Sequence, residues 1–160
     1  MIRLPLTPAQ TILAGGLIMG SLDILKNMVF LSFQGRPVTW VLHAVASGAL
    51  GRKAFDGGLP VAALGLAFHF LIAFTVFTIY YVASRRLPIL ISHAYLLSPI
   101  YGVAVFAFMR FVVFPLSAIG RVPNPLPVLI DGILTHIFCV GLPTGIIVRE
   151  AARKSSTRGL

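Results

Sequence analysis

An apolar run over residues 8–33 is the feature of the sequence that most restricts the fold. As an α-helix this run is about 39 Å long, because each residue adds about 1.5 Å, whereas the hydrocarbon core of a bilayer is about 30 Å thick. The run contains two charged residues, Asp23 and Lys26. At least one of the two charges must therefore lie within the hydrocarbon core, so we expect other parts of the protein to provide polar partners for them.

One face of this helix combines small and polar residues. Gly16, Gly20, Asp23 and Asn27 follow one another at steps of four, three and four, and Lys26 stands three residues after Asp23, which places all five on one side. Gly16-x-x-x-Gly20 lets another helix approach closely, while the polar groups need hydrogen-bonding partners. Asp23 and Lys26 are one turn apart and can pair. The face is therefore either a buried site of charge or proton handling, or an ion pair that fixes helix register.

The composition is that of an integral membrane protein. The chain has 160 residues, of which 58% are hydrophobic and 11% charged, whereas soluble domains have about 25% charged residues. The net charge of +9 does not indicate a nucleic-acid partner, because the basic residues stand mostly at the ends of apolar runs, where lipid headgroups lie. A single cysteine excludes an intrachain disulfide.

Three further apolar runs are long enough to cross a bilayer, at 60–83, 95–119 and 127–148. The run 38–51 is too short to cross and suits a helix that lies in the membrane interface or folds back against the bundle. We therefore predict an all-α fold: a bundle of four transmembrane helices plus one short interfacial or re-entrant helix. Residues 1–160 are expected to form a single transmembrane domain.

The second and third spans each carry one titratable group. His69 lies near the middle of its span, on a face with the small residues Gly65 and Ala73. It is either a hydrogen-bonding strut between helices or a proton or metal site. Arg110 lies inside the third span and needs a carboxylate, carbonyls or water from neighbouring helices. Pro115 removes a backbone donor, which predicts that the helix bends or ends there.

The fourth span carries the remaining polar groups. Gly132, His136, Cys139 and Pro143 share a face, and Asp131 points to an adjacent one. Pro143 leaves a main-chain carbonyl near Cys139 without its usual donor. His136-x-x-Cys139 is only half of a metal site, so we predict no metal centre.

The distribution of basic residues predicts the topology. With four spans, seven basic residues fall on the side of the two termini: Arg3, Arg85, Arg86, Arg149, Arg153, Lys154 and Arg158. Four fall on the other side: Arg36, Arg52, Lys53 and Arg121. Because cytoplasmic segments carry the excess of Lys and Arg, both termini are expected in the cytoplasm.

With this topology, six ionisable groups lie at similar depth, between the midplane and about 10 Å outward of it. They are Asp23, Lys26, His69, Arg110, Asp131 and His136. Two carboxylates and two cations leave such a layer neutral, as buried charges require. We predict a ring in which Arg110 pairs with Asp131 or Asp23, Lys26 takes the other carboxylate, and the histidines donate hydrogen bonds between helices.

Three functions compete for this layer. In the first, the layer is internal glue in a non-enzymatic accessory or assembly subunit that packs on a membrane-protein partner or on a second copy. In the second, it lines a route for protons or small solutes. In the third, His69 and His136 ligate a haem iron from facing helices; otherwise no cofactor is expected. The sequence contains no catalytic triad signature and no nucleotide-binding glycine loop, so we predict no catalytic residues and no enzyme.

The order of these features resembles the YagU-like family of small bacterial inner-membrane proteins. The motifs that carry the resemblance are the glycines and lysine of the first span (Gly16, Gly20, Lys26), Phe114-Pro115-Leu116, a proline-bearing link, the central His136, and Ile147-Val148-Arg149-Glu150. The chain departs from the family pattern in a shorter N-terminus and a shorter link between the first two spans. The resemblance implies a multi-pass protein of the bacterial inner membrane and brings no established reaction, substrate or cofactor.

Overall fold

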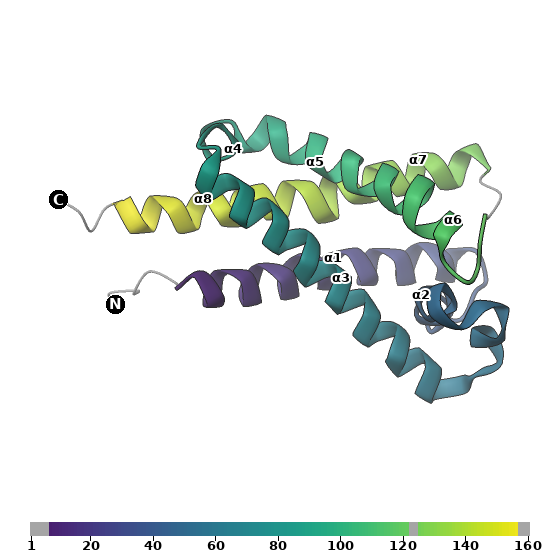
Figure 1. The fold of residues 1–160 in the computed structure, drawn as a ribbon. Coiled ribbons are helices and arrows are strands. Elements are labelled where there is room, and N and C mark those ends of the chain that lie inside the picture. The colour runs from purple at the N-terminus through teal and green to yellow at the C-terminus, as the bar shows by residue number, and fades with distance from the viewer. Residues whose placement is uncertain (1–6, 122–124, 157–160) are drawn as a thin grey trace.

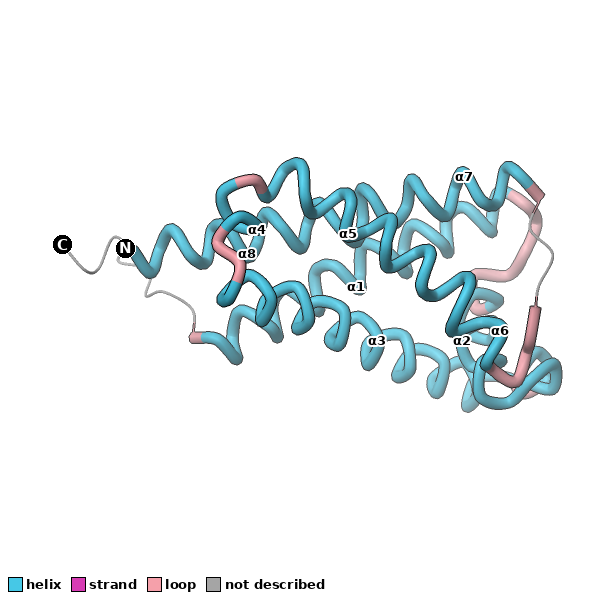
Figure 2. Tube along the Cα trace, turned by 45° about the horizontal axis from the view of Figure 1, so that its top comes forward, coloured by secondary structure: helices cyan, strands magenta, loops and turns pink. Residues whose placement is uncertain are grey.

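The computed structural model describes residues 7–121 and 125–156, and the side chains of these up to residue 154. Within these ranges the chain forms helices and turns, without strands (Figure 1, Figure 2). The α-helices are α1 (Pro8–Phe33), α2 (Trp40–Leu50), α3 (Gly58–Arg86), α4 (Ile89–Ser92), α5 (Ala94–Phe108), α6 (Phe114–Leu116), α7 (Leu126–Thr135) and α8 (Leu142–Ser156). Between them lie the 3₁₀ helix η1 (Gly51–Asp56) and two π-helical segments, η2 (Met109–Val113) and η3 (His136–Gly141).

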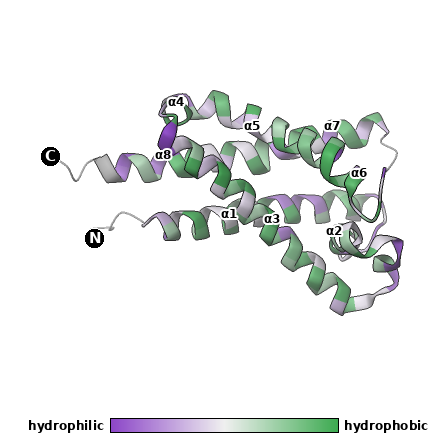
Figure 3. Cartoon of the chain, viewed as in Figure 1, coloured by the Kyte–Doolittle hydropathy of each residue, from purple (hydrophilic) through white to green (hydrophobic). Residues whose placement is uncertain are grey.

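The predicted fold class is confirmed. Over the described residues, four helices are long and apolar enough to cross a membrane: Pro8–Phe33, Gly58–Arg86, Ala94–Leu116 and Leu126–Lys154. Figure 3 shows that hydrophobic residues dominate these helices and that the hydrophilic residues gather mainly at helix ends, apart from a polar stretch within α1. The second and fourth helices extend beyond the predicted 60–83 and 127–148, because polar residues continue the helix past the apolar run.

The start of α1 is fixed by its own sequence. The Thr7 hydroxyl accepts a hydrogen bond from the backbone N–H of Gln10 at 3.2 Å, and the Gln10 side chain accepts one from the Thr7 N–H at 2.9 Å. Pro8 follows, at the first position of the helix, where a backbone N–H would have no acceptor within the helix. This reciprocal capping begins the helix at Pro8 and so determines the depth of Asp23 and Lys26 along it.

Glycines bring α1 and α3 into close contact. A Cβ at Gly16 would overlap the ring of Phe74, and one at Gly20 would lie 2.9 Å from the Cβ of Ala73. A Cβ at Gly15 would overlap Phe77 in the same way. The small residues of the first helix are therefore used for packing inside the chain.

A second close contact joins α5 to η3 and α8, and here backbones touch. A Cβ at Gly102 would overlap the carbonyl oxygen of His136, and one at Gly141 would overlap that of Ser98. At Gly145 it would overlap the Ser98 hydroxyl. Ser98-x-x-x-Gly102 and Gly141-x-x-x-Gly145 thus form a reciprocal pair of small-residue motifs, which the sequence analysis did not single out.

Tyr101 marks the limit of the contact between α3 and α5. Its hydroxyl donates to the Val76 carbonyl at 2.7 Å, and its ring lies 5.0 Å from that of Tyr80. Away from α4 and beyond Tyr101, the two helices diverge (Figure 1, Figure 2). We call the part from α4 to Tyr101 the closed half; its core consists of Met19, Ala73, Phe77, Tyr80, Val140 and Val148. The part toward α2, α6 and the start of α7 is the open half.

In the open half, the short helix α2 packs against α3. It corresponds to the helix predicted at 38–51, and of the two predicted placements it has the one folded back against the bundle. A Cβ at Gly65 would overlap the Leu42 carbonyl, so the helices meet at backbone distance. The Ala118 N–H donates to the Gly48 carbonyl at 2.8 Å. Through these contacts α2 ties the start of α3 to the segment that follows α6.

Candidate functional site

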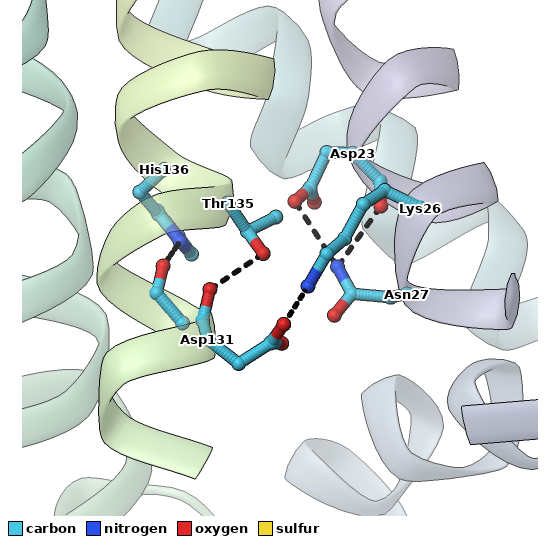
Figure 4. Close-up of polar contacts among 7 residues, drawn as sticks. Asp23, Lys26, Asn27, Asp131, Thr135 and His136 are labelled. Carbon is cyan, nitrogen blue, oxygen red and sulfur yellow. Dashed lines mark hydrogen bonds and ion pairs between the residues drawn. The ribbon is translucent and has the colours of Figure 1, made fainter. Parts of the chain in front are cut away.

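An ion pair between Lys26 and Asp131 joins α1 to α7 in the open half. Figure 4 shows the two side chains reaching toward one another from the two helices. The side chains are 30% and 20% exposed. The Lys26 ammonium also lies 4.5 Å from the ring centroid of Phe30, a cation–π contact on its own helix. Because α1 otherwise packs against α2, α3, η3 and α8, this pair ties α7 to α1.

Asp23 lies one turn before Lys26 on the same side of α1, but it has other partners. The Asn27 amide donates to the Asp23 carboxylate at 3.1 Å and to the Asp23 carbonyl at 2.9 Å. The other carboxylate oxygen lies 3.9 Å from Nδ1 of His69 on α3. Asp23 and Lys26, which could have paired with each other, therefore each reach a different neighbouring helix.

His69 connects α3 to α1 in two ways. Its Nε2 lies 2.8 Å from the carbonyl oxygen of Gly20, and since a carbonyl only accepts, Nε2 carries the proton. Nδ1 then faces the Asp23 carboxylate. The buried histidine joins α3 to α1 through its hydrogen bond to Gly20, as an interhelical strut would.

His136 and Thr135 make hydrogen bonds within their own helix. Nδ1 of His136 donates to the Gly132 carbonyl at 2.8 Å, and the Thr135 hydroxyl donates to the Asp131 carbonyl at 2.7 Å (Figure 4). The His136 ring meets that of Phe106 at 5.2 Å, edge to face. Its contact with α5 is therefore aromatic, which differs from the predicted donation of a hydrogen bond between helices. Gly132 gives Phe106 room, because a Cβ there would overlap its ring.

Arg110 corrects the predicted ring. The two carboxylates of the layer pair with Lys26 and His69, so the prediction that Arg110 takes one of them does not match the structure. Its guanidinium carbon lies 5.8 Å from the ring centroid of Phe114. The reason lies in the backbone: Arg110 stands in the π segment η2, which shifts the side chains away from the α-helical register assumed from the sequence.

Both π segments precede a proline. Pro115 and Pro143 lack an N–H for the carbonyl four residues earlier, at Phe111 and Cys139, and these residues lie within η2 and η3. The helix widens at both places and, after Pro115, ends at Leu116, as predicted. The thiol of Cys139 is half-buried.

Two observations concern a metal or cofactor in the charged layer. Over the described residues, no group of three or more His, Cys, Asp and Glu side chains is arranged to hold a metal ion. The haem alternative does not fit His69, since its two ring nitrogens face the Gly20 carbonyl and the Asp23 carboxylate. An axial ligand needs one of these nitrogens for iron.

Comparison of the chain with protein-family models, with curated proteins and with solved structures finds no match. The resemblance to the YagU-like family therefore stays an expectation from short motifs. The function has to be argued from the geometry of the layer.

Proposed function

We propose that the protein is a non-enzymatic, multi-pass protein of the bacterial inner membrane that acts as an accessory or assembly subunit of a membrane complex. The observation that carries this proposal is the internal pairing of the charged layer. Lys26 with Asp131 and Asp23 with His69 link α1 to two other helices of the same chain. Charges paired in this way fix how helices sit together, which is the role of structural glue.

A membrane-protein partner would contact the outer surface of the bundle, because the charged layer pairs inside it. Large apolar side chains are exposed on all four spans, among them Leu13, Leu71, Phe111 and Phe138. In a membrane they meet lipid tails or the helices of another membrane protein. With the small residues used inside the bundle, an accessory role would rely on these bulky side chains.

The test is copurification from native membranes. A tagged full-length chain, extracted in a mild detergent, is expected to bring down a different membrane protein in stoichiometric amount. As a control, the same tag on an unrelated four-span protein of similar abundance should not recover that protein. Recovery of the chain alone, or only with itself, in several mild detergents would contradict the proposal.

A second candidate is proton-coupled or small-solute transport. The specific observation in its favour is that two ionisable side chains, His69 and Asp23, lie 3.9 Å apart inside the bundle, next to a Lys26–Asp131 pair that is partly exposed. In proteoliposomes, Asp23→Asn and Arg110→Gln should then abolish a proton or solute flux while the bundle stays folded. Variants that lose flux only because they unfold would favour the structural role.

A further inference from the structure

A small cavity lies in the closed half, where α1, α3, α4 and α8 meet. Its volume is about 20 Å³, room for roughly one water-sized group. The lining includes Thr11 of α1, Tyr81, Ser84 and Arg85 of α3, Ile91 of α4 and Val148 of α8. Thr11 stands near the start of α1, several turns before Lys26, so the cavity is separate from the Lys26–Asp131 pair, and the proposed function makes no use of it.

This cavity lies at the level expected for lipid headgroups. Arg85 and Arg86 are the last residues of α3, one of the four candidate spans. The exposed Tyr95, near the start of α5, stacks under Arg149 at 4.8 Å. Tyrosine and arginine at the ends of spanning helices are typical of the membrane–water interface.

The surroundings of the cavity are strongly basic. Five cationic side chains stand at the adjacent ends of α3 and α8, against one carboxylate, Glu150. The cations are Arg85, Arg86, Arg149, Arg153 and Lys154. Such a cluster at the bilayer surface attracts anionic headgroups.

Arg85 is the charged hydrogen-bond donor at the cavity. The Thr11 hydroxyl donates to the Thr7 carbonyl at 3.0 Å, and the Ser84 hydroxyl donates to the Tyr81 carbonyl at 2.7 Å. Both of these hydroxyl protons are therefore used within the helices, and among the described residues that line the cavity the positive charge comes from the exposed guanidinium of Arg85. The planar fork of N–H groups on arginine matches the oxygens of a phosphate.

We propose that this cavity and Arg85 bind the phosphate of an anionic phospholipid. One headgroup oxygen enters the cavity, the guanidinium of Arg85 holds the phosphate at its mouth, and the neighbouring cations add attraction without direct specificity. The site is independent of the charged layer, so it stands or falls separately from the proposed function.

The test is native mass spectrometry of the purified full-length protein titrated with phosphatidylglycerol and, separately, with phosphatidylcholine. Phosphatidylglycerol is expected to bind at least fivefold more tightly. Arg85→Gln should weaken phosphatidylglycerol binding by about fivefold or more. Arg86→Gln, next to the cavity but outside its lining, should have a smaller effect. Arg52→Gln, which also precedes a basic residue but lies in the open half, should have none.

Three outcomes would overturn the inference. Equal binding of the two lipids would exclude selection of an anionic headgroup. Equal losses in the three variants would show attraction by overall charge and no site at Arg85. Complete displacement of the lipid by millimolar inorganic phosphate would assign the site to a soluble phosphate. Unchanged thermal unfolding of Arg85→Gln in phosphatidylcholine alone serves as the control for folding.

Discussion

The closed and open halves of the bundle are held together by different kinds of contact. In the closed half, α5 meets η3 and α8 with backbone against backbone at Gly102 and Gly141. In the open half, α1 reaches α7 through the side chains of Lys26 and Asp131. The comparison teaches that neighbouring parts of one small bundle tolerate change very differently. Steric contact leaves no space for even one methyl group, whereas a partly exposed ion pair can be rearranged or replaced.

The largest effect is expected from Gly102→Ala in the closed half. The new methyl group would overlap the His136 carbonyl, so α5 must move away from η3, at a cost of about 3 kcal/mol in the free energy of unfolding. Gly48→Ala is the matched control, because its nearest neighbour would be 3.9 Å away and alanine favours the helix by up to about 1 kcal/mol. Denaturant titration in mixed micelles measures both; equal stability of the two variants would break the comparison.

The next effect comes from the open half. Asp131→Asn leaves the Lys26 ammonium without its carboxylate and should destabilise the protein by about 2 kcal/mol. This is less than the 3–5 kcal/mol of a fully buried pair, because the Lys26 side chain is 30% exposed. The double variant Lys26→Met, Asp131→Leu should recover most of that loss, since it removes both charges. A double variant less stable than Asp131→Asn would show that the pair does more than neutralise charge.

A smaller effect is expected at His69, where α3 and α1 meet between the two halves. His69→Leu removes a buried hydrogen bond to the Gly20 carbonyl and should cost about 1–2 kcal/mol. His43→Leu removes a similar bond, at 2.9 Å to the Gly58 carbonyl, but at an exposed site, and should cost less than about 0.5 kcal/mol. If both substitutions cost the same in mixed-micelle unfolding, burial would not be what gives His69 its importance.

The smallest effect is expected beyond the cores of both halves, at the end of α8. Glu150→Gln breaks a pair with Arg153 in which both side chains are largely exposed, at 45% and 68%. Such surface pairs contribute about 0–1 kcal/mol, so the midpoint of unfolding should stay within error of the wild type. If Glu150→Gln lowers the free energy of unfolding as much as Asp131→Asn does, the burial of an ion pair does not determine how much that pair stabilises the bundle.

Much of the fold could be predicted from the sequence, since length and apolar character alone decide whether a segment can cross a bilayer. The first span, for example, matches the apolar run at residues 8–33. The small-residue faces of Gly16, Gly20 and Gly65 were also visible as spacings of three and four, although the sequence did not tell which helix each would face.

The contacts of the charged layer could not be predicted in the same way. Residue depth brought Lys26, Arg110, Asp131 and Asp23 to one level but did not decide which cation would reach which carboxylate. That choice depends on side-chain direction, which a π segment alters at Arg110. A proline downstream is the signal that could have indicated such a segment. The pairing of Ser98 with Gly145 was missed because it becomes visible only once two distant helices are docked.

The account depends most on the pairing of Lys26 with Asp131 within one chain, and charge exchange tests it directly. The free energy of unfolding in mixed micelles is compared for Lys26→Asp, Asp131→Lys and the double exchange. Each single variant places two like charges opposite one another, and the double exchange restores an attractive pair. If the two side chains pair, the double variant is more stable than either single variant. A double variant that shows the sum of the two single losses would mean that they do not pair.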